Sequence, residues 1–316
     1  MNMKKGLLIQ GPMISSGFSP YHFTQHGKYE RVWIDYNAIN NVMKIIDDAS
    51  KFFDIIVIST WDNPTAKQFI SLKIFPRNVF MVLSSEKDIP RERISSDTHK
   101  YHQIYSSLVG ALRLESLGCE IIAKVRTDQF VNLEELSKSV DKHQKKPKYS
   151  IGVPYLNIFE MDRLTDFYLV SRASVMIETF RNYLSLKESY QDTHKDYFHN
   201  FSKIIINLSG IDKIKYFNNL NKYPHKINLL VWSTIFYPLD PKLYTKFLWR
   251  GIKVNHKING WIRFYKLLTV SNYAWLPFAM SYNFISLNFA KCFRVIMMRP
   301  QSYVLFHTQS RKSRKQ

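Results

Sequence analysis

The stretch Ile121-Ile122-Ala123-Lys124-Val125-Arg126-Thr127-Asp128-Gln129-Phe130 decides the fold that we expect. It follows Gly118, begins as an apolar run and turns polar at Arg126, a pattern typical of a buried strand. In open α/β sheets, ligands bind beyond the carboxyl ends of such strands. There the carboxylate of Asp128 can ligate Mg²⁺ or Mn²⁺, which bridges phosphate oxygens, while Arg126 adds a forked donor pair. The simpler alternative is a salt bridge between Arg126 and Asp128 at the strand end.

The rest of the chain predicts a three-layer α/β sandwich with a mostly parallel central sheet. Apolar runs predict buried strands, and apolar residues at helical spacing predict the helices between them. The order strand, helix, strand, strand, helix, strand with right-handed crossovers specifies this architecture. Besides the stretch above, the expected strands cover residues 5–10, 54–62, 78–85 and 151–158, and the expected helices cover 35–53, 101–117, 132–140, 175–184 and 190–207. We expect Asp35 to cap the first helix, and loops at residues 15–19 and 90–99.

Length and composition bound the class of protein. The chain has 316 residues, of which 45% are hydrophobic, and this suffices for one large α/β domain, alone or with a small appendage. Its two cysteines, Cys119 and Cys292, lie far apart and indicate a reducing compartment rather than a disulfide framework. The apolar run within residues 1–10 is too short for a signal peptide, so we expect a chain that is not exported. Neither a GxGxxG fingerprint nor a P-loop motif is present, which disfavours dinucleotide oxidoreductases and P-loop NTPases.

The net charge of +20 is concentrated near the carboxyl terminus. Residues 241–316 contain fourteen Lys and Arg residues and no Asp or Glu. Such a region favours a polyanionic partner, either nucleic acid or the anionic surface of a membrane. Within it, Leu267–Ala290 is uncharged over 24 residues but is interrupted by polar residues and Pro277, so we expect helices that lie in a membrane interface rather than span the bilayer. An ordinary packed helix followed by a disordered basic tail is the alternative.

Five short motifs occur in a characteristic order and spacing. They are Gln10-Gly11-Pro12, Ile58-Ser59-Thr60-Trp61, Gln103-Ile104-x-Ser106-Ser107 with Gly110, Lys124-Val125-Arg126-Thr127-Asp128 and Thr165-Asp166-Phe167-Tyr168. Over about residues 5–190 this combination resembles the WavE lipopolysaccharide synthesis family of bacterial glycosyltransferases. The resemblance implies a GT-A-like, Rossmann-like fold, to which the charge and composition of residues 241–316 add an expected basic helical carboxyl-terminal extension. It also implies an enzyme that moves a sugar from a nucleotide sugar to a growing lipopolysaccharide core or surface polysaccharide.

The resemblance further implies a donor site at the carboxyl edge of the sheet. GT-A enzymes usually carry an Asp-x-Asp that binds a divalent cation, but here Arg126 takes the first position and leaves Asp128 as the single expected metal ligand. We therefore expect either Mn²⁺ or Mg²⁺ at Asp128, or a reaction in which Arg126 supplies positive charge to the leaving diphosphate. Gln103, near a helix start, would be helped by the helix dipole, and Trp61 either stacks on a nucleobase or packs in the core. The full expected donor set is Gln10, Gly11, Pro12, Thr60, Trp61, Asp62, Gln103, Arg126 and Asp128.

Deprotonation of the acceptor hydroxyl requires a base, for which we predict Asp166. Its aromatic neighbours would partly desolvate the carboxylate and raise its pKa toward a useful range. A capping role at the Thr165–Asp166 turn is the alternative. Asp162 and Glu188 are further candidates, although Glu188 fits a solvated helix face equally well.

These inferences divide the chain into a donor-binding domain at 1–180, an acceptor-side helical region at 181–240 and a basic, aromatic, membrane-associating region at 241–316. The expected partners are a nucleotide sugar, a lipid-linked oligosaccharide acceptor and an anionic membrane surface, without nucleic acid. The expected location is the cytoplasmic side of the inner membrane. Two alternatives stay open: a non-catalytic scaffold, suggested by the missing first acidic residue, and a nucleic-acid-binding protein, suggested by the charge but lacking a recognisable binding motif.

Overall fold

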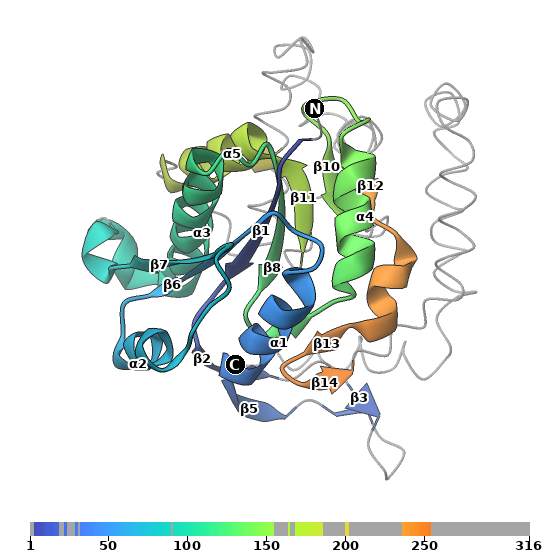
Figure 1. Ribbon diagram of the computed structural model, residues 1–316. Helices are drawn as coiled ribbons and strands as arrows, with labels where there is room; N and C mark the ends of the chain where they lie inside the picture. The colour runs from blue at the N-terminus through green and yellow to red at the C-terminus, as the bar shows by residue number, and fades with distance from the viewer. Residues whose placement is uncertain are drawn as a thin grey trace, which may run out of the picture. The chain divides into compact units, whose positions relative to one another are not determined.

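The computed structural model describes residues 3–18, 22–23, 29–30, 32–89, 91–154, 164, 168–185, 200–201 and 236–253. The chain divides into two units, residues 1–256 and 257–316, and every described residue belongs to the first. Its described part contains a seven-stranded central sheet, three small sheets and five α-helices (Figure 1). None of these described helices is both long enough and apolar enough to cross a membrane.

The central sheet has the strand order β12-β10-β11-β8-β1-β6-β7. β11 runs antiparallel to both of its neighbours and every other pair is parallel, so the expected α/β fold with a mostly parallel sheet is confirmed. The strands are β1 (Lys5–Gln10), β6 (Ile55–Trp61), β7 (Val79–Ser84), β8 (Ile121–Arg126), β10 (Ile151–Val153), β11 (Leu169–Arg172) and β12 (Phe236–Pro238).

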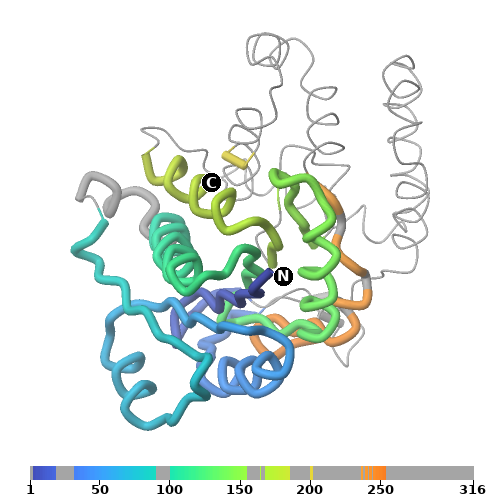
Figure 2. The backbone as a smooth tube through the Cα atoms, turned by 45° about the horizontal axis from the view of Figure 1, so that its top comes forward, coloured from blue at the N-terminus to red at the C-terminus, as the bar shows by residue number. Residues whose placement is uncertain are grey.

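Helices cover both faces of this sheet and so form the two outer layers of the sandwich. α3 (Arg91–Ser116) and α5 (Ala173–Ser185) pack against each other on one face, and α1 (Ile39–Ala49) and α4 (Leu133–His143) meet on the other (Figure 2). Strands that are covered on both faces are apolar along their whole length, which explains the continuous apolar runs that predicted β1, β6 and β8.

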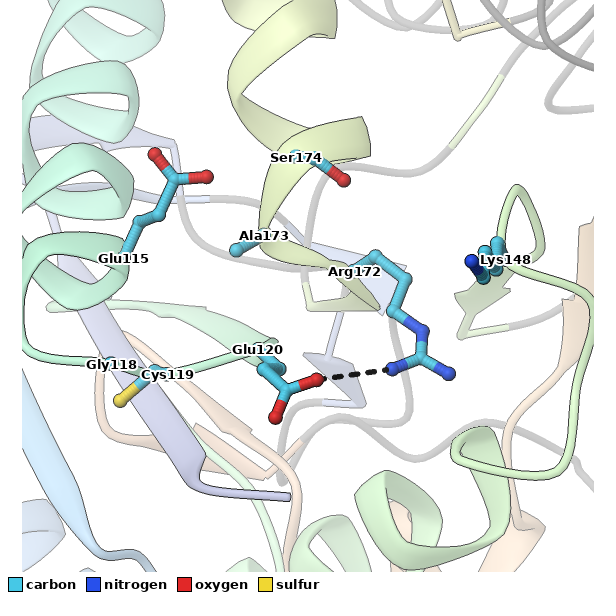
Figure 3. Close-up of a pocket in the computed structure, with 8 residues that line it drawn as sticks. All are labelled: Glu115, Gly118, Cys119, Glu120, Lys148, Arg172, Ala173 and Ser174. Atoms are coloured by element: carbon cyan, nitrogen blue, oxygen red, sulfur yellow. Dashed lines mark ion pairs between the residues drawn. The ribbon is translucent and has the colours of Figure 1, made fainter.

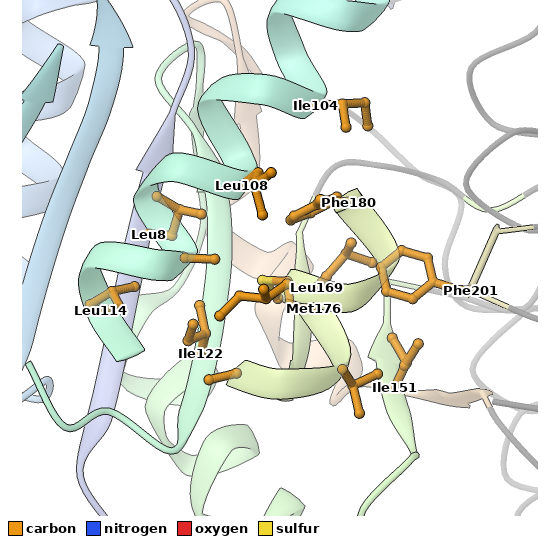
Figure 4. Close-up of a cluster of buried hydrophobic side chains, with 14 of the residues drawn as sticks. Leu8, Ile104, Leu108, Leu114, Ile122, Ile151, Leu169, Met176, Phe180 and Phe201 are labelled. Atoms are coloured by element: carbon orange, nitrogen blue, oxygen red, sulfur yellow. The ribbon is translucent and has the colours of Figure 1, made fainter. Parts of the chain in front are cut away.

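The main apolar cluster lies between the sheet and the α3–α5 layer (Figure 4). Leu8 and Ile122 from the central strands meet Leu108 of α3 and Met176 and Phe180 of α5, and all five side chains are buried. Burial of one side chain of this size contributes about 1.5–3 kcal/mol. This layer therefore fixes β1 and β8, and with them the position of the strand ends.

The direction of the strand order changes beside β1. From β1 the chain passes through α1 to β6 and through α2 (Pro64–Leu72) to β7, and α3 then carries it back across to β8 on the other side of β1. In doubly wound sheets, ligands bind in the crevice at the carboxyl ends of the strands at such a switch point. Two small sheets lie at this end of β1 in Figure 1. They are the ribbon of β2 (Ile14–Phe18) with β5 (Trp33–Asn37), and the sheet of β9 (Gln129–Phe130), β13 (Leu248–Trp249) and β14 (Ile252–Lys253).

The remaining described elements are short. They are the pair β3 (His22–Phe23) and β4 (Tyr29–Glu30) and the 3₁₀ helices η1 (Glu86–Asp88) and η2 (Pro241–Lys246).

Three local expectations from the sequence are wrong. Asp35 lies in β5, and α1 follows Ala38, so Asp35 does not cap that helix. The expected loop at 15–19 is largely strand β2, because its Ser/Gly-rich residues pair with β5. α3 begins at Arg91, within the second expected loop, because a helix whose first turns are polar has no apolar periodicity to reveal it.

The expected boundaries at residues 180 and 240 differ from the division of the structure. β12 pairs with β10, η2 packs on α4, and β13 pairs with β9, so residues 236–253 complete the same unit as the sheet. The interfacial helices expected at Leu267–Ala290 lie outside the described residues.

Candidate functional site

The candidate site lies at the carboxyl edge of the sheet, where β1 and β8 end side by side. Gln10, the last residue of β1, is the register partner of Ser59 on β6 and of Arg126 on β8. Thr60 follows Ser59 on β6. The predicted donor residues at the ends of β1, β6 and β8 are thereby brought to one edge.

Gln10 is almost completely buried, with 3% of its surface exposed. Its Nε2 donates a hydrogen bond to Oγ of Ser106 on α3 at 2.9 Å, and Ser106 donates to the carbonyl of His102 at 2.8 Å. Among the described residues, the Oε1 atom of Gln10 has no hydrogen-bond partner. A buried acceptor without a partner costs free energy, so this position retains an unused capacity to accept a hydrogen bond.

Gly11 allows the segments after β1 and β8 to approach closely. Its φ is +137°, and a Cβ at this position would lie 2.6 Å from Oγ1 of Thr127. That hydroxyl donates to the carbonyl of Pro12 at 2.8 Å. Asn41 of α1 donates to the carbonyls of Thr127 and Gln129 at 2.7 and 2.8 Å. The two segments are therefore tied to each other and to α1.

Asp128 is buried among four N–H donors. Arg126 donates from Nε to Oδ1 at 2.9 Å and from Nη2 to Oδ2 at 3.0 Å. Trp249 Nε1 and Arg250 Nε donate to Oδ2 at 3.2 and 3.4 Å. The salt bridge considered as the simpler alternative is thus present, and two residues from the β13–β14 hairpin extend it.

Opposing effects act on the Asp128 carboxyl. Burial would raise its pKa, but the charge and hydrogen bonds of Arg126, the charge of Arg250 and the hydrogen bond from Trp249 together hold the pKa below its ordinary value of 3.8. The group is therefore ionised at neutral pH despite its burial. Its negative charge orients both guanidinium groups.

The turn that carries Arg250 has an unusual sequence for its conformation. Arg250 and Gly251 connect β13 and β14 with φ values of +51° and +76°. Two-residue turns with positive φ favour Asn, Asp and Gly, since a left-handed conformation costs other L-residues about 1–2 kcal/mol. Contacts hold Arg250 there: its N–H donates to the carbonyl of Asp128 at 2.7 Å, and Nη1 donates to the carbonyl of Phe18 at 3.0 Å.

Our sequence analysis missed Trp249, Arg250 and Asn41. The sequence offered only a weak signal for the first two, because Arg-Gly is not one of the residue pairs that typically predict a two-residue hairpin. No pattern in the sequence indicated that this hairpin would reach Asp128, 121 residues earlier in the chain.

The surroundings of Asp128 do not fit a divalent cation well. No group of three or more His, Cys, Asp or Glu side chains that could hold a metal ion occurs among the described residues. Both oxygens of Asp128 already accept hydrogen bonds from cationic or indole donors. The cation expected at Asp128 stays a prediction, and the charges that meet this carboxylate belong to the protein itself.

Other predicted donor residues have varied surroundings. Oγ1 of Thr60 is buried without a hydrogen-bond partner in the part of the chain that the structure describes, as are both side-chain polar atoms of Gln129. Trp61 packs edge-on against His102, with ring centroids 4.4 Å apart, and is partly buried against the core. Asp62 forms an ion pair with Lys67 at 2.9 Å on the surface. Trp61 and Asp62 therefore have structural partners of their own.

Two further groups of predictions have different outcomes. Gln103 lies about three turns inside α3, so the helix-dipole argument for it fails. Asp166, Asp162 and Glu188, the candidate bases, lie outside the described residues.

A cavity of about 340 Å³ lies at the opposite, amino edge of the sheet (Figure 3). It is lined by Glu115, Gly118, Cys119, Glu120, Lys148, Arg172, Ala173 and Ser174. Arg172 is 4.0 Å from Glu120 across it. None of the predicted site residues lines this cavity.

No family model and no curated protein matches the chain, so the resemblance to the WavE family stays a prediction. Among solved structures, this chain is similar to 4-diphosphocytidyl-2C-methyl-D-erythritol synthase from Anaerococcus prevotii. The two share 10% sequence identity with a TM-score of 0.40, and the match covers 84% of this chain and 96% of that one. It is also similar to a cytidylyltransferase from Leptospira borgpetersenii, with 12% identity, a TM-score of 0.38 and coverage of 86% and 98%. A mannose-1-phosphate geranyltransferase from Thermus thermophilus gives 8% identity, a TM-score of 0.31 and coverage of 62% and 67%. Likeness at this level carries no argument about activity.

Proposed function

We propose that this chain is a nucleotide-sugar-dependent glycosyltransferase whose acceptor is a growing lipopolysaccharide core or surface polysaccharide. The observation that carries the proposal is the pair of guanidinium groups, Arg126 and Arg250, that meet on Asp128 at the switch point of the sheet. Arginine presents a planar fork of donors that matches phosphate oxygens. Beside this pair, Gln10 and Thr60 offer buried polar atoms without partners.

In the proposed reaction, a nucleoside diphosphate leaves the sugar and needs stabilisation of its developing negative charge. Arg126 contacts the diphosphate with the part of its side chain that is exposed, while Asp128 orients the guanidinium through the bidentate contact. Arg250 holds the other side of the Asp128 carboxylate. The guanidinium charge thus does part of what a divalent cation at Asp128 would do. Asp166 remains our candidate for the base, with Asp162 and Glu188 behind it.

The acceptor in this proposal is a lipid-linked oligosaccharide. The enzyme would reach it from the cytoplasmic side of the inner membrane, with the basic residues of 241–316 on the anionic surface. This part of the proposal rests on charge and composition. Vesicle binding by the full chain, compared between neutral and anionic lipids and at low and high salt, tests it.

Thermal unfolding with a panel of nucleoside diphosphates and nucleotide sugars, with and without Mn²⁺, tests the donor site. A ligand that binds the folded state alone stabilises it by about 2.7 kcal/mol at a hundredfold excess over its dissociation constant. We expect a rise in the midpoint for one nucleotide base that is lost in Arg126→Gln. Arg77→Gln is the matched control, because it removes the same charge from an exposed residue just before β7, at the amino edge.

The result that would contradict the proposal is a folded wild-type chain that responds to no nucleotide. That result would favour the non-catalytic scaffold. A specific observation supports this alternative: the Asp128 carboxylate already has four donors from the protein. A response that requires Mn²⁺ would instead restore the divalent cation to the mechanism.

A further inference from the structure

The β2–β5 ribbon exposes aromatic side chains beside the candidate site. Phe18 and Trp33 are opposite each other in the register of the two strands, and their rings meet edge to face with centroids 5.2 Å apart. Trp33 is 61% exposed and Phe18 is 51% exposed. Large exposed aromatic groups that lie together on one surface are uncommon without a binding role.

The two faces of this ribbon differ. The inner face is occupied, because Gly17 leaves the space that the Arg250 guanidinium fills and Tyr36 lies beside Gly251. Side chains alternate between faces along a strand, so Phe18 and Trp33 point to the other side. The Arg250 Nη1 that donates to the Phe18 carbonyl ties the ribbon to Asp128. The outer face is therefore separated from the candidate diphosphate site by the thickness of one ribbon.

Polar groups share the outer face with the aromatic pair. Ser16 and Asp35 are opposite each other in the next outward-facing pair, both exposed. The outer face thus combines two aromatic rings with a hydroxyl and a carboxylate, and its last pair adds Ile14, which is 53% exposed, and the amide of Asn37. This combination suits a pyranose ring, whose C–H groups pack on aromatic faces while its hydroxyls bond to carboxylate and hydroxyl oxygens.

We infer that the outer face of the β2–β5 ribbon binds a sugar unit of the oligosaccharide acceptor, one that lies away from the reacting end. Trp33, the more exposed ring, provides the face on which the sugar stacks, Phe18 lies at 85° to it and bounds this face, and Asp35 accepts hydrogen bonds from sugar hydroxyls. The inference rests on the proposed function. The position on the far side of the ribbon from Asp128 requires an extended acceptor, because a monosaccharide in contact with Trp33 would not reach the leaving diphosphate.

A lipid surface is the main competing occupant, and the position of Asp35 argues against it. Its carboxylate lies in the pair of residues adjacent to the aromatic pair. Insertion of Trp33 and Phe18 into a bilayer would draw this charge toward the hydrocarbon, which is unfavourable. A glycan instead uses the same carboxylate as an acceptor.

Saturation-transfer NMR on the full chain tests the inference with methyl glycosides of glucose, galactose, mannose and N-acetylglucosamine and with cellotetraose as probes. We expect transfer to ring C–H protons of at least one probe, and binding about tenfold weaker in Trp33→Ala. Asp35→Asn should also weaken it. Leu72→Ala is the matched control, since Leu72 is a 68% exposed apolar residue on α2. Trp33→Phe, which keeps an aromatic ring, should retain part of the binding and guards against a folding defect in the alanine variant.

Three results would overturn the inference. The first is no transfer to any probe, and the second is glycoside binding in Trp33→Ala equal to that of wild type. The third is loss of binding to phosphatidylcholine–phosphatidylglycerol vesicles in Trp33→Ala, which would identify a lipid-contacting face. Nucleoside diphosphate binding by the same samples separates the two proposals. A wild-type chain that binds a nucleotide but no glycoside refutes the platform alone. A chain that binds no nucleotide refutes the proposed function.

Discussion

The two edges of the central sheet differ in how deeply their charged side chains are buried and in how many partners these side chains have. At the amino edge, the structure has a cavity lined by Glu120 and Arg172, and charged side chains there form partly exposed pairs such as Lys5 with Asp141, whose Nζ and Oδ1 atoms are 3.2 Å apart. At the carboxyl edge, Asp128 is buried and receives four hydrogen bonds from three residues. Exposed pairs of the first kind contribute little to stability, whereas a buried carboxylate is stable only with its partners in place.

The difference shows that the edge with the cavity need not be the edge that carries the candidate functional residues. The amino edge offers space, and among the described residues Nε of Arg172 there is also buried without a hydrogen-bond partner, but the carboxyl edge gathers such atoms from three residues, Gln10, Thr60 and Gln129. Evolution tolerates unpartnered buried groups where they serve another purpose, because each one costs stability. The carboxyl edge is therefore the better candidate for a site.

The largest effect that we expect is a difference in the free energy of unfolding between variants that remove one carboxylate at each edge. Asp128→Asn should destabilise the fold by about 3–5 kcal/mol, because it leaves Arg126 and Arg250 partly buried without a counter-charge. Asp141→Asn, at the exposed pair with Lys5, should cost less than about 1 kcal/mol. Urea unfolding of both variants measures the difference. Equal losses would show that the Asp128 cluster is no more coupled than a surface pair.

A second pair of variants compares glycines at the two edges. Gly11→Ala should cost about 3 kcal/mol, since it combines a φ of +137° with a Cβ only 2.6 Å from Oγ1 of Thr127. Gly118→Ala has a φ of +84° but its Cβ would meet nothing nearer than Lys4 at 3.9 Å, so about 1 kcal/mol is expected. Chemical denaturation checks both. Similar costs would mean that the contact with Thr127 relaxes freely.

Titration should distinguish the edges by the pH range in which each loses stability, because acid destabilises both. Burial first, and then the charges of Arg172 and Lys146, lower the pKa of His143 to about 4 from its ordinary value of 6.5. The unfolded chain therefore takes up this proton first, and the folded state loses stability as the pH falls from 6.5 toward 4. Between pH 7 and pH 5 this loss is about 2 kcal/mol. The pKa of Asp128 is also lowered in the folded state, so its contribution to stability is complete above its ordinary pKa of 3.8 and is lost as the pH falls below that value, where the unfolded chain takes up the proton first.

The measurement is the free energy of unfolding of wild type and His143→Gln at pH 7 and pH 5. The variant should lose less stability than wild type over this interval, because it removes the buried imidazole while a side-chain amide can still bond to Tyr237. An identical pH dependence of the two proteins would contradict the assignment.

The smallest expected effect concerns the cavity at the amino edge. Burial, despite a lowering influence from Lys4, raises the pKa of the Cys119 thiol to about 11. Although Cys119 lines the cavity, it should react with iodoacetamide far more slowly than a free thiol, since the thiolate is the reactive form. Mass spectrometry of the native chain after timed alkylation measures this. Rapid modification of Cys119 would show that its thiol is accessible to iodoacetamide and readily deprotonated, contrary to this prediction.

Local patterns in the sequence identified the sheet but not all of the site. The apolar runs of β1, β6 and β8 predicted the strands, and the polar residues after each run predicted which edge would carry Gln10, Thr60 and Arg126. Both follow from local periodicity and from the rule that parallel strands end together.

The partners of Asp128 could not be found in this way. Trp249 and Arg250 reach it from a hairpin 121 residues or more away, and no local pattern encodes a tertiary contact of that separation. The expected metal at Asp128 came from its position at a strand end and from the resemblance to GT-A enzymes, and neither indicated that Trp249 and Arg250 would donate to the same carboxylate. Asp35 was misplaced for a different reason: as an acidic residue shortly before Ile39 it suited a cap, but α1 begins after Ala38 without a side-chain cap, and Asp35 belongs to β5.

Amide hydrogen exchange of the full chain, with and without the nucleoside diphosphate that most raises its unfolding midpoint, tests the central claim most directly. We predict slower exchange in peptides covering residues 9–13, 59–62 and 126–130, at the carboxyl edge, and no change at 115–120 and 172–175, around the amino-edge cavity. Protection confined to the amino-edge peptides, or no local protection at either edge in saturating nucleotide, would contradict the account.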